Sequence, residues 1–219
     1  MNKVPNMINL LIDGVSITAP QGSNLLAVCQ ENDIYIPHLC FLEGEDRPTA
    51  CCRLCFVEIE EMTSPVPACT VTVTQDLKVK TNTEIVRGLQ RSGLRMLLSI
   101  HDVDCKKCFA NHKCELQTIA KFLQISLKPS PLPQIDRPKE IDTSHPHIDY
   151  YSHRCVLCGK CIRVCRSQHG LPAFSFIGRG IDTAIHHYPQ NDQLEPQCLD
   201  CQSCIDICPV GALKKREAG

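Results

Sequence analysis

Alternating apolar and polar positions at the start of the chain predict a β-hairpin. The apolar positions are Ile8, Leu10, Ile12, Val15 and Ile17, and Asp13-Gly14 separates the two runs. An Asp-Gly pair between alternating runs is typical of a tight two-residue turn. Similar alternation predicts further strands at Val57, Ile59, Val71, Val73, Leu77 and Val79. Ser23 is the predicted cap of a helix beginning at Leu25. Residues 1–80 are therefore predicted to form a small sheet crossed by a helix.

Helical periodicity follows in residues 81–125. The first predicted helix, Glu84–Ile100, has its apolar face at Ile85, Leu89, Met96, Leu97 and Ile100. The second has its apolar face at Leu116, Ile119, Ala120 and Leu123. Prolines among polar residues then predict an extended connector over 126–147. Residues 148–219 repeat one cysteine spacing, which indicates a two-fold ferredoxin-like unit, and the whole pattern predicts an α+β protein.

Cysteine changes this picture, because 17 of the 219 residues are cysteines while aromatic residues make up only 5%. Few apolar side chains are left for an ordinary core, so bound metal is expected to contribute to folding. The net charge of −1 argues against a nucleic-acid partner. No export signal and no apolar segment long enough to span a membrane is visible. We therefore expect a soluble, cytoplasmic protein in which close cysteines bind metal rather than form disulfides.

The first candidate site is a [2Fe-2S] cluster held by Cys40, Cys52, Cys55 and Cys69. One close pair with two distant thiolates is typical of plant-type ligation, although the gap from Cys40 to Cys52 is longer than in that type. We assign Cys52 rather than the adjacent Cys51, because its C-x2-C spacing to Cys55 lets one turn present both sulfurs to the same iron. A zinc site or buried thiols are the alternatives.

The second candidate site is a [4Fe-4S] cluster held by His101, Cys105, Cys108 and Cys114. Three cysteines with no fourth nearby need a partner, and His101 ends the predicted helix just before them. A neutral imidazole is a competent iron ligand. In place of a thiolate it removes a negative charge, which should raise the reduction potential. His112 or a water molecule is the alternative fourth ligand.

Two further [4Fe-4S] clusters are predicted from two runs of the form C-x2-C-x2-C-x3-C. In two-cluster ferredoxins the fourth cysteine of each run binds the other cluster. We therefore assign Cys155, Cys158, Cys161 and Cys208 to one cluster. The other is assigned Cys165, Cys198, Cys201 and Cys204. Zinc or disulfides are the alternatives.

Two cysteines and several basic residues are left over. Cys29 and Cys51 have no cluster role in this assignment, and Cys29 is predicted to be buried on a helix face. The basic residues that flank the ligands are Lys106, Lys107, Lys160, Arg163 and Arg166. They offset the negative charge of the clusters, guide a partner, or are simply solvated.

The complete set of motifs resembles a known group of iron-sulfur proteins. The resemblance rests on Cys40 with the run C-R-L-C and Cys69, on His101 with its three cysteines, and on two ferredoxin runs ending in I-C-P-V-G-A-L. The runs I-P-H-L-C at 36–40 and G-R-G-I-D-T at 178–183 add to it. These features resemble the N-terminal part of the large iron-sulfur subunit of respiratory complex I. They also resemble the diaphorase small subunit of NAD-reducing hydrogenases and the N-terminal module of iron-only hydrogenases.

The resemblance implies a plant-ferredoxin-like β-grasp domain, a helical His/Cys3 segment and a bacterial-ferredoxin-like domain with two clusters. It favours His101 as the fourth ligand. It also implies an electron-transfer subunit of an NAD(H)-linked complex. The implied partners are a flavoprotein that binds FMN and NAD(H), and a hydrogenase, formate dehydrogenase or similar catalytic subunit.

A catalytic site within this chain is not expected. Neither a G-x-G-x-x-G run after a strand nor a G-x-x-x-x-G-K run occurs, so we expect no NAD or ATP site. Four ligands for each predicted cluster leave no open iron for a substrate. Because the sequence stops at Gly219, a stand-alone relay subunit is expected. A cluster-bearing redox sensor or assembly protein is the alternative.

Overall fold

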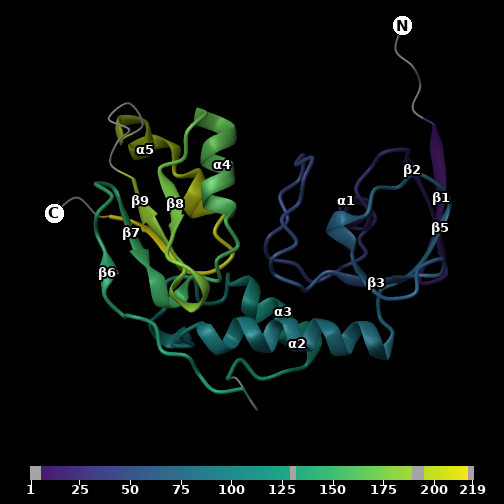
Figure 1. The fold of residues 1–219 in the computed structure, drawn as a ribbon, viewed down its shortest axis with the longest axis horizontal. Coiled ribbons are helices and arrows are strands. Elements are labelled where there is room, and N and C mark those ends of the chain that lie inside the picture. The colour runs from purple at the N-terminus through teal and green to yellow at the C-terminus, as the bar shows by residue number, and fades with distance from the viewer. Residues whose placement is uncertain (1–5, 129–131, 189–194, 217–219) are drawn as a thin grey trace, which may run out of the picture. The chain divides into compact units, whose positions relative to one another are not determined.

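The computed structural model describes residues 6–128, 132–188 and 195–216 as a mixture of helices and short strands (Figure 1). Contacts within the chain divide it into two compact units. The first is Met1–Leu94 with Leu123–Ile125, and the second is Arg95–Phe122 with Ser126–Gly219. The predicted α+β class is confirmed. The predicted domain boundaries near residues 80, 125 and 147 stay predictions.

A five-stranded sheet in the order β2-β1-β5-β3-β4 forms the framework of the first unit. Its strands are β1 (Met7–Ile12), β2 (Val15–Pro20), β3 (Phe56–Ile59), β4 (Val66–Pro67) and β5 (Leu77–Lys80). β1 runs parallel to β5, and the other pairs are antiparallel. The predicted hairpin is confirmed, since Asp13 and Gly14 join β1 to β2 with φ of 48° and 87°. Both φ values are positive, as a type I′ turn requires.

Helix α1 (Leu25–Glu31) buries Leu25, Leu26, Val28 and Cys29 in the same apolar cluster as the inward residues of the strands. The predicted cap was wrong by one residue. Asn24, not Ser23, precedes the helix, and its side-chain oxygen accepts hydrogen bonds from the Leu26 and Ala27 amides at 3.0 and 3.3 Å. Asparagine is as good a helix cap as serine, so residue preference alone could not decide between Ser23 and Asn24.

Two residues that were predicted to lie in a strand do not. Ala68–Thr70 form a short 3-10 helix, η1, and Val71 and Val73 follow it outside the named strands. Only an isolated bridge joins Thr72 to Asn24 in the part of the chain described. Both valines are buried. Their alternation therefore reflects packing against the core rather than pairing in the sheet.

Helix α2 spans Glu84–Ile100, as predicted, but its buried face was predicted incorrectly. Ile85 and Met96 are 61% and 55% exposed, whereas Val86, Leu94 and Leu98 are fully buried. Gln90 is buried as well, and its side-chain amide donates to the Phe56 carbonyl at 3.1 Å. A polar residue on the buried face shifts the apparent apolar stripe, which misled the periodicity argument. Helix α3 (Glu115–Leu123) buries Leu116, Ile119, Ala120 and Leu123, which confirms its predicted face.

The described part of the second unit contains two small antiparallel sheets and three further helices. One sheet has the order β10-β7-β6, and the other is the hairpin β8-β9. The strands are β6 (Ile141–Asp142), β7 (Ile148–Tyr151), β8 (Phe174–Ile177), β9 (Ala184–His187) and β10 (Leu213–Lys215). The helices are α4 (Lys160–His169), α5 (Glu195–Cys201) and α6 (Ser203–Asp206). Single 3-10 turns occur at η2 (Cys105–Lys107), η3 (Ser152–Arg154) and η4 (Gly180–Asp182).

The predicted proline-rich connector is held against the second unit where the structure describes it, with residues 129–131 outside the described ranges. The Ile135 amide donates to the Ser99 carbonyl at 2.7 Å. The Arg137 side chain donates to the carbonyls of Ser152, Cys155 and Thr183 at 3.2 to 3.5 Å. Within the described ranges, no helix has the length and apolar character needed to cross a membrane.

Candidate iron-sulfur sites

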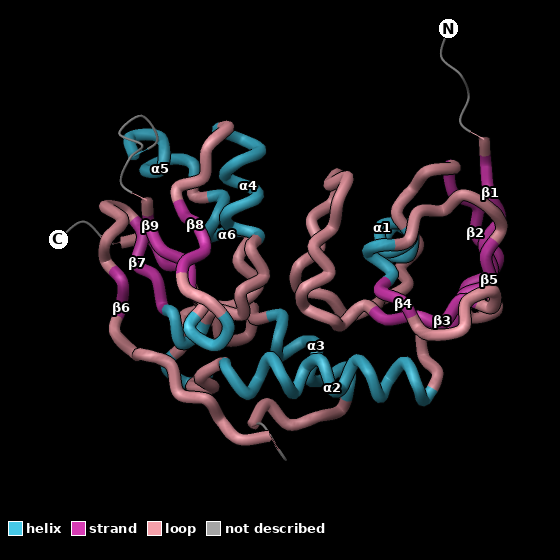
Figure 2. Tube along the Cα trace, in the orientation of Figure 1, coloured by secondary structure: helices cyan, strands magenta, loops and turns pink. Residues whose placement is uncertain are grey.

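The four residues of the predicted [2Fe-2S] site come from irregular segments beside the first sheet. Figure 2 shows the chain between α1 and β3, which contains three of them, as loop. All four thiols are at most 5% exposed. The residues are Cys40, Cys52, Cys55 and Cys69.

These thiols form two hydrogen-bonded pairs. The Cys51 and Cys52 thiols both donate to Cys40, which holds the pKa of Cys40 well below its usual value, and the bond to Cys40 raises the pKa of Cys52. The Cys55 thiol donates to Cys69, and this bond raises the pKa of Cys55. The expectation that Cys52 and Cys55 face the same iron stays a prediction. The thiol contacts in the structure join Cys40 to Cys51 and Cys52, and Cys55 to Cys69.

The reason for this pairing lies in the turn between Cys52 and Cys55. Arg53 adopts a left-handed conformation with φ of 55°, so the run C-R-L-C is not one helical turn. Its carbonyl lies against Gly93 of α2, where an added Cβ would come within 2.5 Å of the carbonyl oxygen. A side chain at position 93 is therefore incompatible with this turn.

The two leftover cysteines have different surroundings. Cys29 is buried on α1, and burial raises the pKa of its thiol to about 12. Cys51 is exposed, and its thiol donates to Cys40, so it lies beside the predicted ligands. The register chosen from the sequence places the buried Cys52, rather than the exposed Cys51, among the ligands.

His101 has the geometry expected of a neutral imidazole ligand. Its Nδ1 lies 2.8 Å from the Arg154 carbonyl oxygen. A carbonyl can only accept, so the proton is on Nδ1 and the lone pair of Nε2 is available for a metal. Burial lowers the pKa of His101 to about 4, which keeps the ring neutral near pH 7. The alternative, His112, is exposed on a loop with φ of 68°.

The three cysteines predicted to join His101 lie near one another. Cys114 is buried, and its pKa is raised mainly by burial and further by the nearby Cys108 and Cys105 thiols. Cys108 lies against Gly211, where an added Cβ would approach the Cys108 sulfur to 2.7 Å. Gly211 follows Cys208 by three residues. The second and third candidate sites are therefore neighbours within the second unit.

The cationic side chain of Arg154 lies close to His101. Its guanidinium lies over the Tyr151 ring at 4.7 Å and over the Phe109 ring at 5.5 Å from the centroids. Only 9% of Arg154 is exposed. A buried cation held by aromatic rings can offset negative charge at the adjacent site.

The third candidate site is a cavity in the second unit. Cys155, Cys158, Cys161 and Cys208 line it, with apolar neighbours that include Ile185 and Val210. Burial raises the pKa of Cys158 to about 12 and that of Cys208 to about 11. Tyr150 donates a hydrogen bond to the Cys155 sulfur, and the Leu157 amide donates to it at 3.4 Å. Leu157 is left-handed, with φ of 53°, which turns the loop around the cavity.

The fourth candidate site combines one cysteine of α4 with the last cysteine run. Burial raises the pKa of Cys204 to about 12, and the thiols of Cys165, Cys198 and Cys201 raise it further, so the four lie near one another. The Ala173 amide donates to Cys165 at 3.3 Å. Hydrogen bonds from Ser203 and His169 lower the pKa of Cys201. The fourth cysteine of each run thus lies with the other run.

The residues present fit iron-sulfur clusters better than single metal ions. Each cysteine of a [4Fe-4S] cluster binds a different iron, so the sulfurs surround a volume rather than converge on a point. Among the described residues no three cysteine, histidine or acidic side chains converge as a single ion would require. No disulfide joins the 17 cysteines, all of which lie in the described ranges. Ligation by the named residues remains a prediction.

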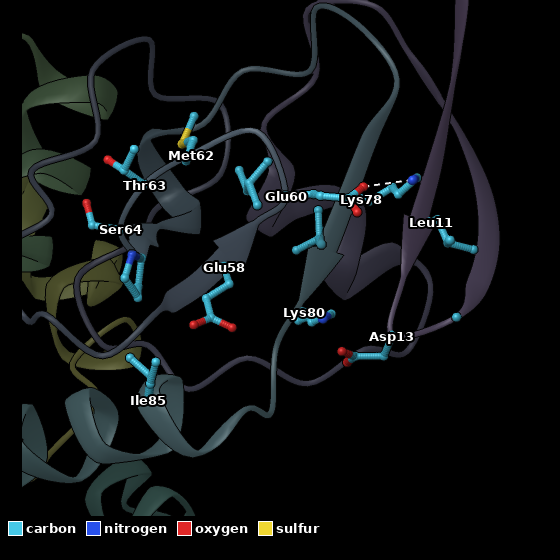
Figure 3. A pocket seen from close by; sticks show the side chains of 14 residues that line it. Leu11, Asp13, Glu58, Glu60, Met62, Thr63, Ser64, Lys78, Lys80 and Ile85 are labelled. Atoms are coloured by element: carbon cyan, nitrogen blue, oxygen red, sulfur yellow. Dashed lines mark ion pairs between the residues drawn. The ribbon is translucent and has the colours of Figure 1, made fainter.

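A larger cavity in the first unit is unrelated to these sites. Its lining includes Leu11, Glu58, Met62 and an exposed ion pair in which Lys78 Nζ lies 2.7 Å from Glu60 Oε2 (Figure 3). None of its lining residues is a cysteine or histidine. An exposed pair of this kind contributes little to stability.

Several residues near the candidate sites were not predicted from the sequence. Arg137 and Arg154 are two of them, and Arg154 precedes a ligand directly, which was an available signal. His169 is a third, four residues after Cys165 on α4. Of the flanking basic residues, Arg163 donates to the carbonyls of Cys158 and Gly159 and so supports the loop.

Family comparisons agree with this geometry. A family model described as a 2Fe-2S iron-sulfur cluster binding domain matches residues 5–84. A model described as the NADH-ubiquinone oxidoreductase-G iron-sulfur binding region matches residues 90–127. The ferredoxin-like domain of NADH-quinone oxidoreductase subunit 3 matches residues 145–214. The chain resembles the iron-sulfur subunits of NADH- and NADPH-linked oxidoreductases. This confirms the resemblance found in the sequence.

Individual relatives match nearly the whole chain but extend beyond it. The NADP-reducing hydrogenase subunit HndD of Solidesulfovibrio fructosivorans is 32% identical over 97% of this chain and 37% of its own length. The NADH-ubiquinone oxidoreductase 75 kDa subunit of Reclinomonas americana is 31% identical over 96% of this chain and 30% of its own length. The chain therefore spans only a minor part of the length of these relatives.

A solved structure of similar length also matches. In the crystal structure of an NAD+-reducing [NiFe]-hydrogenase in its H2-reduced state, one chain superposes with a TM-score of 0.82 and 29% identity. The alignment covers 97% of this chain and 88% of that chain. The two proteins thus share a fold over almost their full lengths.

Proposed function

We propose that this chain is an electron-transfer subunit with one [2Fe-2S] and three [4Fe-4S] clusters. The ligands are the four sets of residues predicted from the sequence, with His101 in the second. The observation that supports this most strongly is the cavity lined by Cys155, Cys158, Cys161 and Cys208, residues that lie as many as 53 positions apart. When bound, each cluster would accept and release one electron.

The contacts between the second and third sites suit a relay. His101 donates from Nδ1 to the carbonyl of Arg154, whose peptide bond leads directly to Cys155. One hydrogen bond of 2.8 Å and one peptide bond therefore connect His101 to Cys155, two predicted ligand residues of different clusters. Cys108 and Gly211 form a second contact between these sites.

Partners follow by analogy with the relatives and belong to this proposal. The similar proteins are named as subunits of NADP-reducing hydrogenase, NADH-ubiquinone oxidoreductase and NAD+-reducing hydrogenase. We propose a flavoprotein that binds FMN and exchanges hydride with NAD(H) on one side. A hydrogenase, formate dehydrogenase or similar catalytic subunit would lie on the other. Hydride chemistry then stays with the flavin and this chain handles single electrons.

Iron and acid-labile sulfide per chain test the proposal directly. Anaerobically prepared protein should contain about 14 iron atoms, and the dithionite-reduced sample should show one [2Fe-2S] and overlapping [4Fe-4S] EPR signals. Rapid reoxidation by a separate acceptor would distinguish a relay from a sensor. Zinc, or iron for only one or two clusters in fully loaded protein, would refute the four-cluster assignment.

A further inference from the structure

Helix α4 places three polar or sulfur-bearing side chains toward the last cysteine run. Cys165, Gln168 and His169 occupy positions i, i+3 and i+4, which lie on one face of a helix. Cys165 is a predicted ligand of the fourth cluster. The other two reach Cys201, a predicted ligand of the same cluster. His169 Nε2 lies 3.3 Å from the Cys201 sulfur, and Gln168 Oε1 lies 3.3 Å from it.

The helix holds His169 in a defined position. His169 is the last residue of α4, and Gly170 ends the helix with φ of 79° while its amide donates to the Arg166 carbonyl at 2.9 Å. His169 is partly buried, whereas Gln168 is exposed. Ser203, on the other side of Cys201, has its hydroxyl 3.3 Å from the same sulfur. Side chains from α4 and from the last cysteine run therefore both lie within 3.3 Å of the Cys201 sulfur.

Binding of iron decides the direction of these hydrogen bonds. A cysteine that binds a cluster is a thiolate, which has no proton and can only accept. His169 must then donate from Nε2, Ser203 from its hydroxyl, and Gln168 from its amide nitrogen after that amide group rotates by half a turn. A hydrogen bond to a ligand sulfur stabilises the more negative, reduced cluster more than the oxidised one. Such bonds therefore raise the reduction potential.

We propose that His169 donates a hydrogen bond to the Cys201 sulfur and so raises the reduction potential of the cluster held by Cys165, Cys198, Cys201 and Cys204. This inference rests on the proposed function, because it requires that cluster. It assigns His169 a role through Cys201 rather than as a ligand. The same helix then supplies both a ligand and the group that adjusts the potential of the cluster.

The test is an EPR-monitored redox titration of the full chain at one fixed pH. His169→Phe removes the donor, and His169→Gln retains one. We expect His169→Phe to lower the ratio of reduced to oxidised cluster on the order of tenfold at a given potential, which is about 59 mV for a one-electron couple. His169→Gln should lie nearer the unmodified chain. His186→Phe is the matched control, because His186 pairs with Asp142 at 3.0 Å and neither residue is a predicted ligand.

A Cys198→Ser variant identifies which signal belongs to this cluster. If the unmodified chain lacks that signal and has iron for fewer than four clusters, the proposed function fails, and the inference about His169 with it. If the signal is present and His169→Phe leaves its potential unchanged at full iron content, only the inference is overturned. If His169→Phe loses the cluster, His169→Leu provides a second donor-free side chain. Loss of the cluster in both the His169→Phe and the His169→Leu variants would show that His169 is a structural residue. That result would overturn its role in setting the potential.

Discussion

Gly211 lies where a side chain would reach a predicted ligand, since its missing Cβ leaves room for the Cys108 sulfur. We expect Gly211→Ala to displace that sulfur and to weaken or abolish the His/Cys3 cluster, at an overpacking cost of about 1–3 kcal/mol. Iron content should fall by about four atoms per chain, and one [4Fe-4S] EPR signal should disappear. Gly88→Ala is the control, because nothing lies within 4 Å of a Cβ at that position. Full iron in both variants would contradict this prediction.

Cys29 and Cys51 provide a second test at the residue scale. In the cluster-loaded chain the predicted ligands are bound to iron, and burial raises the pKa of Cys29 to about 12, so it is neutral and inaccessible at about pH 8. Only the exposed Cys51 should react with iodoacetamide under anaerobic conditions. Peptide mass spectrometry of the treated protein identifies which cysteines carry the label. Labelling of Cys52 with protection of Cys51 would show that the register of the first site is shifted by one residue.

At the scale of elements, helix α2 shows that an apolar residue on a helix need not be buried. Leu98 is fully buried, whereas Met96, two residues earlier in the same helix, is 55% exposed. Leu98→Ala should lower the free energy of unfolding by about 2–5 kcal/mol. Met96→Ala should change it by less than about 0.5 kcal/mol. Thermal unfolding of the two cluster-loaded variants compares them directly. Equal losses would contradict the assignment of Leu98 to the buried face and of Met96 to the exposed face of α2.

At the scale of the whole molecule, we expect the two units to depend on metal to different extents. The first has a continuous apolar cluster that joins its strands to α1, with members such as Leu10, Ile12 and Val57. In the second, described strands are two to four residues long, and many of its buried residues are predicted ligands. We therefore expect bound clusters to contribute more of the folding free energy in the second unit.

Removal of iron should expose this difference. After anaerobic treatment with a chelator and mild oxidant, amide hydrogen exchange should increase most in the segments around Cys155–Cys165 and Cys198–Cys208. Strands β1, β2 and β5 should keep most of their protection. Hydrogen-exchange mass spectrometry of loaded and iron-free protein measures this. Similar loss of protection in both units would show that the first core is also metal-dependent.

The sequence by itself determined the elements whose signals are local. The Asp13-Gly14 turn needs two positive φ values, and α2 and α3 follow from apolar spacing over two or more turns. Cysteine spacing was equally informative, because short C-x2-C runs restrict which sulfurs can surround a cluster. The resemblance to iron-sulfur subunits, the α+β class and the cluster types all follow from such short-range patterns.

The tertiary structure alone decided the features that depend on residues distant in sequence. The Cys40–Cys52 and Cys55–Cys69 pairs depend on the left-handed turn at Arg53, and the buried face of α2 depends on Gln90 finding the Phe56 carbonyl. The contacts of Gly211 with Cys108 and of His169 with Cys201 join segments more than 30 residues apart. Periodicity and spacing describe one segment at a time, whereas these contacts exist only once the segments have packed together.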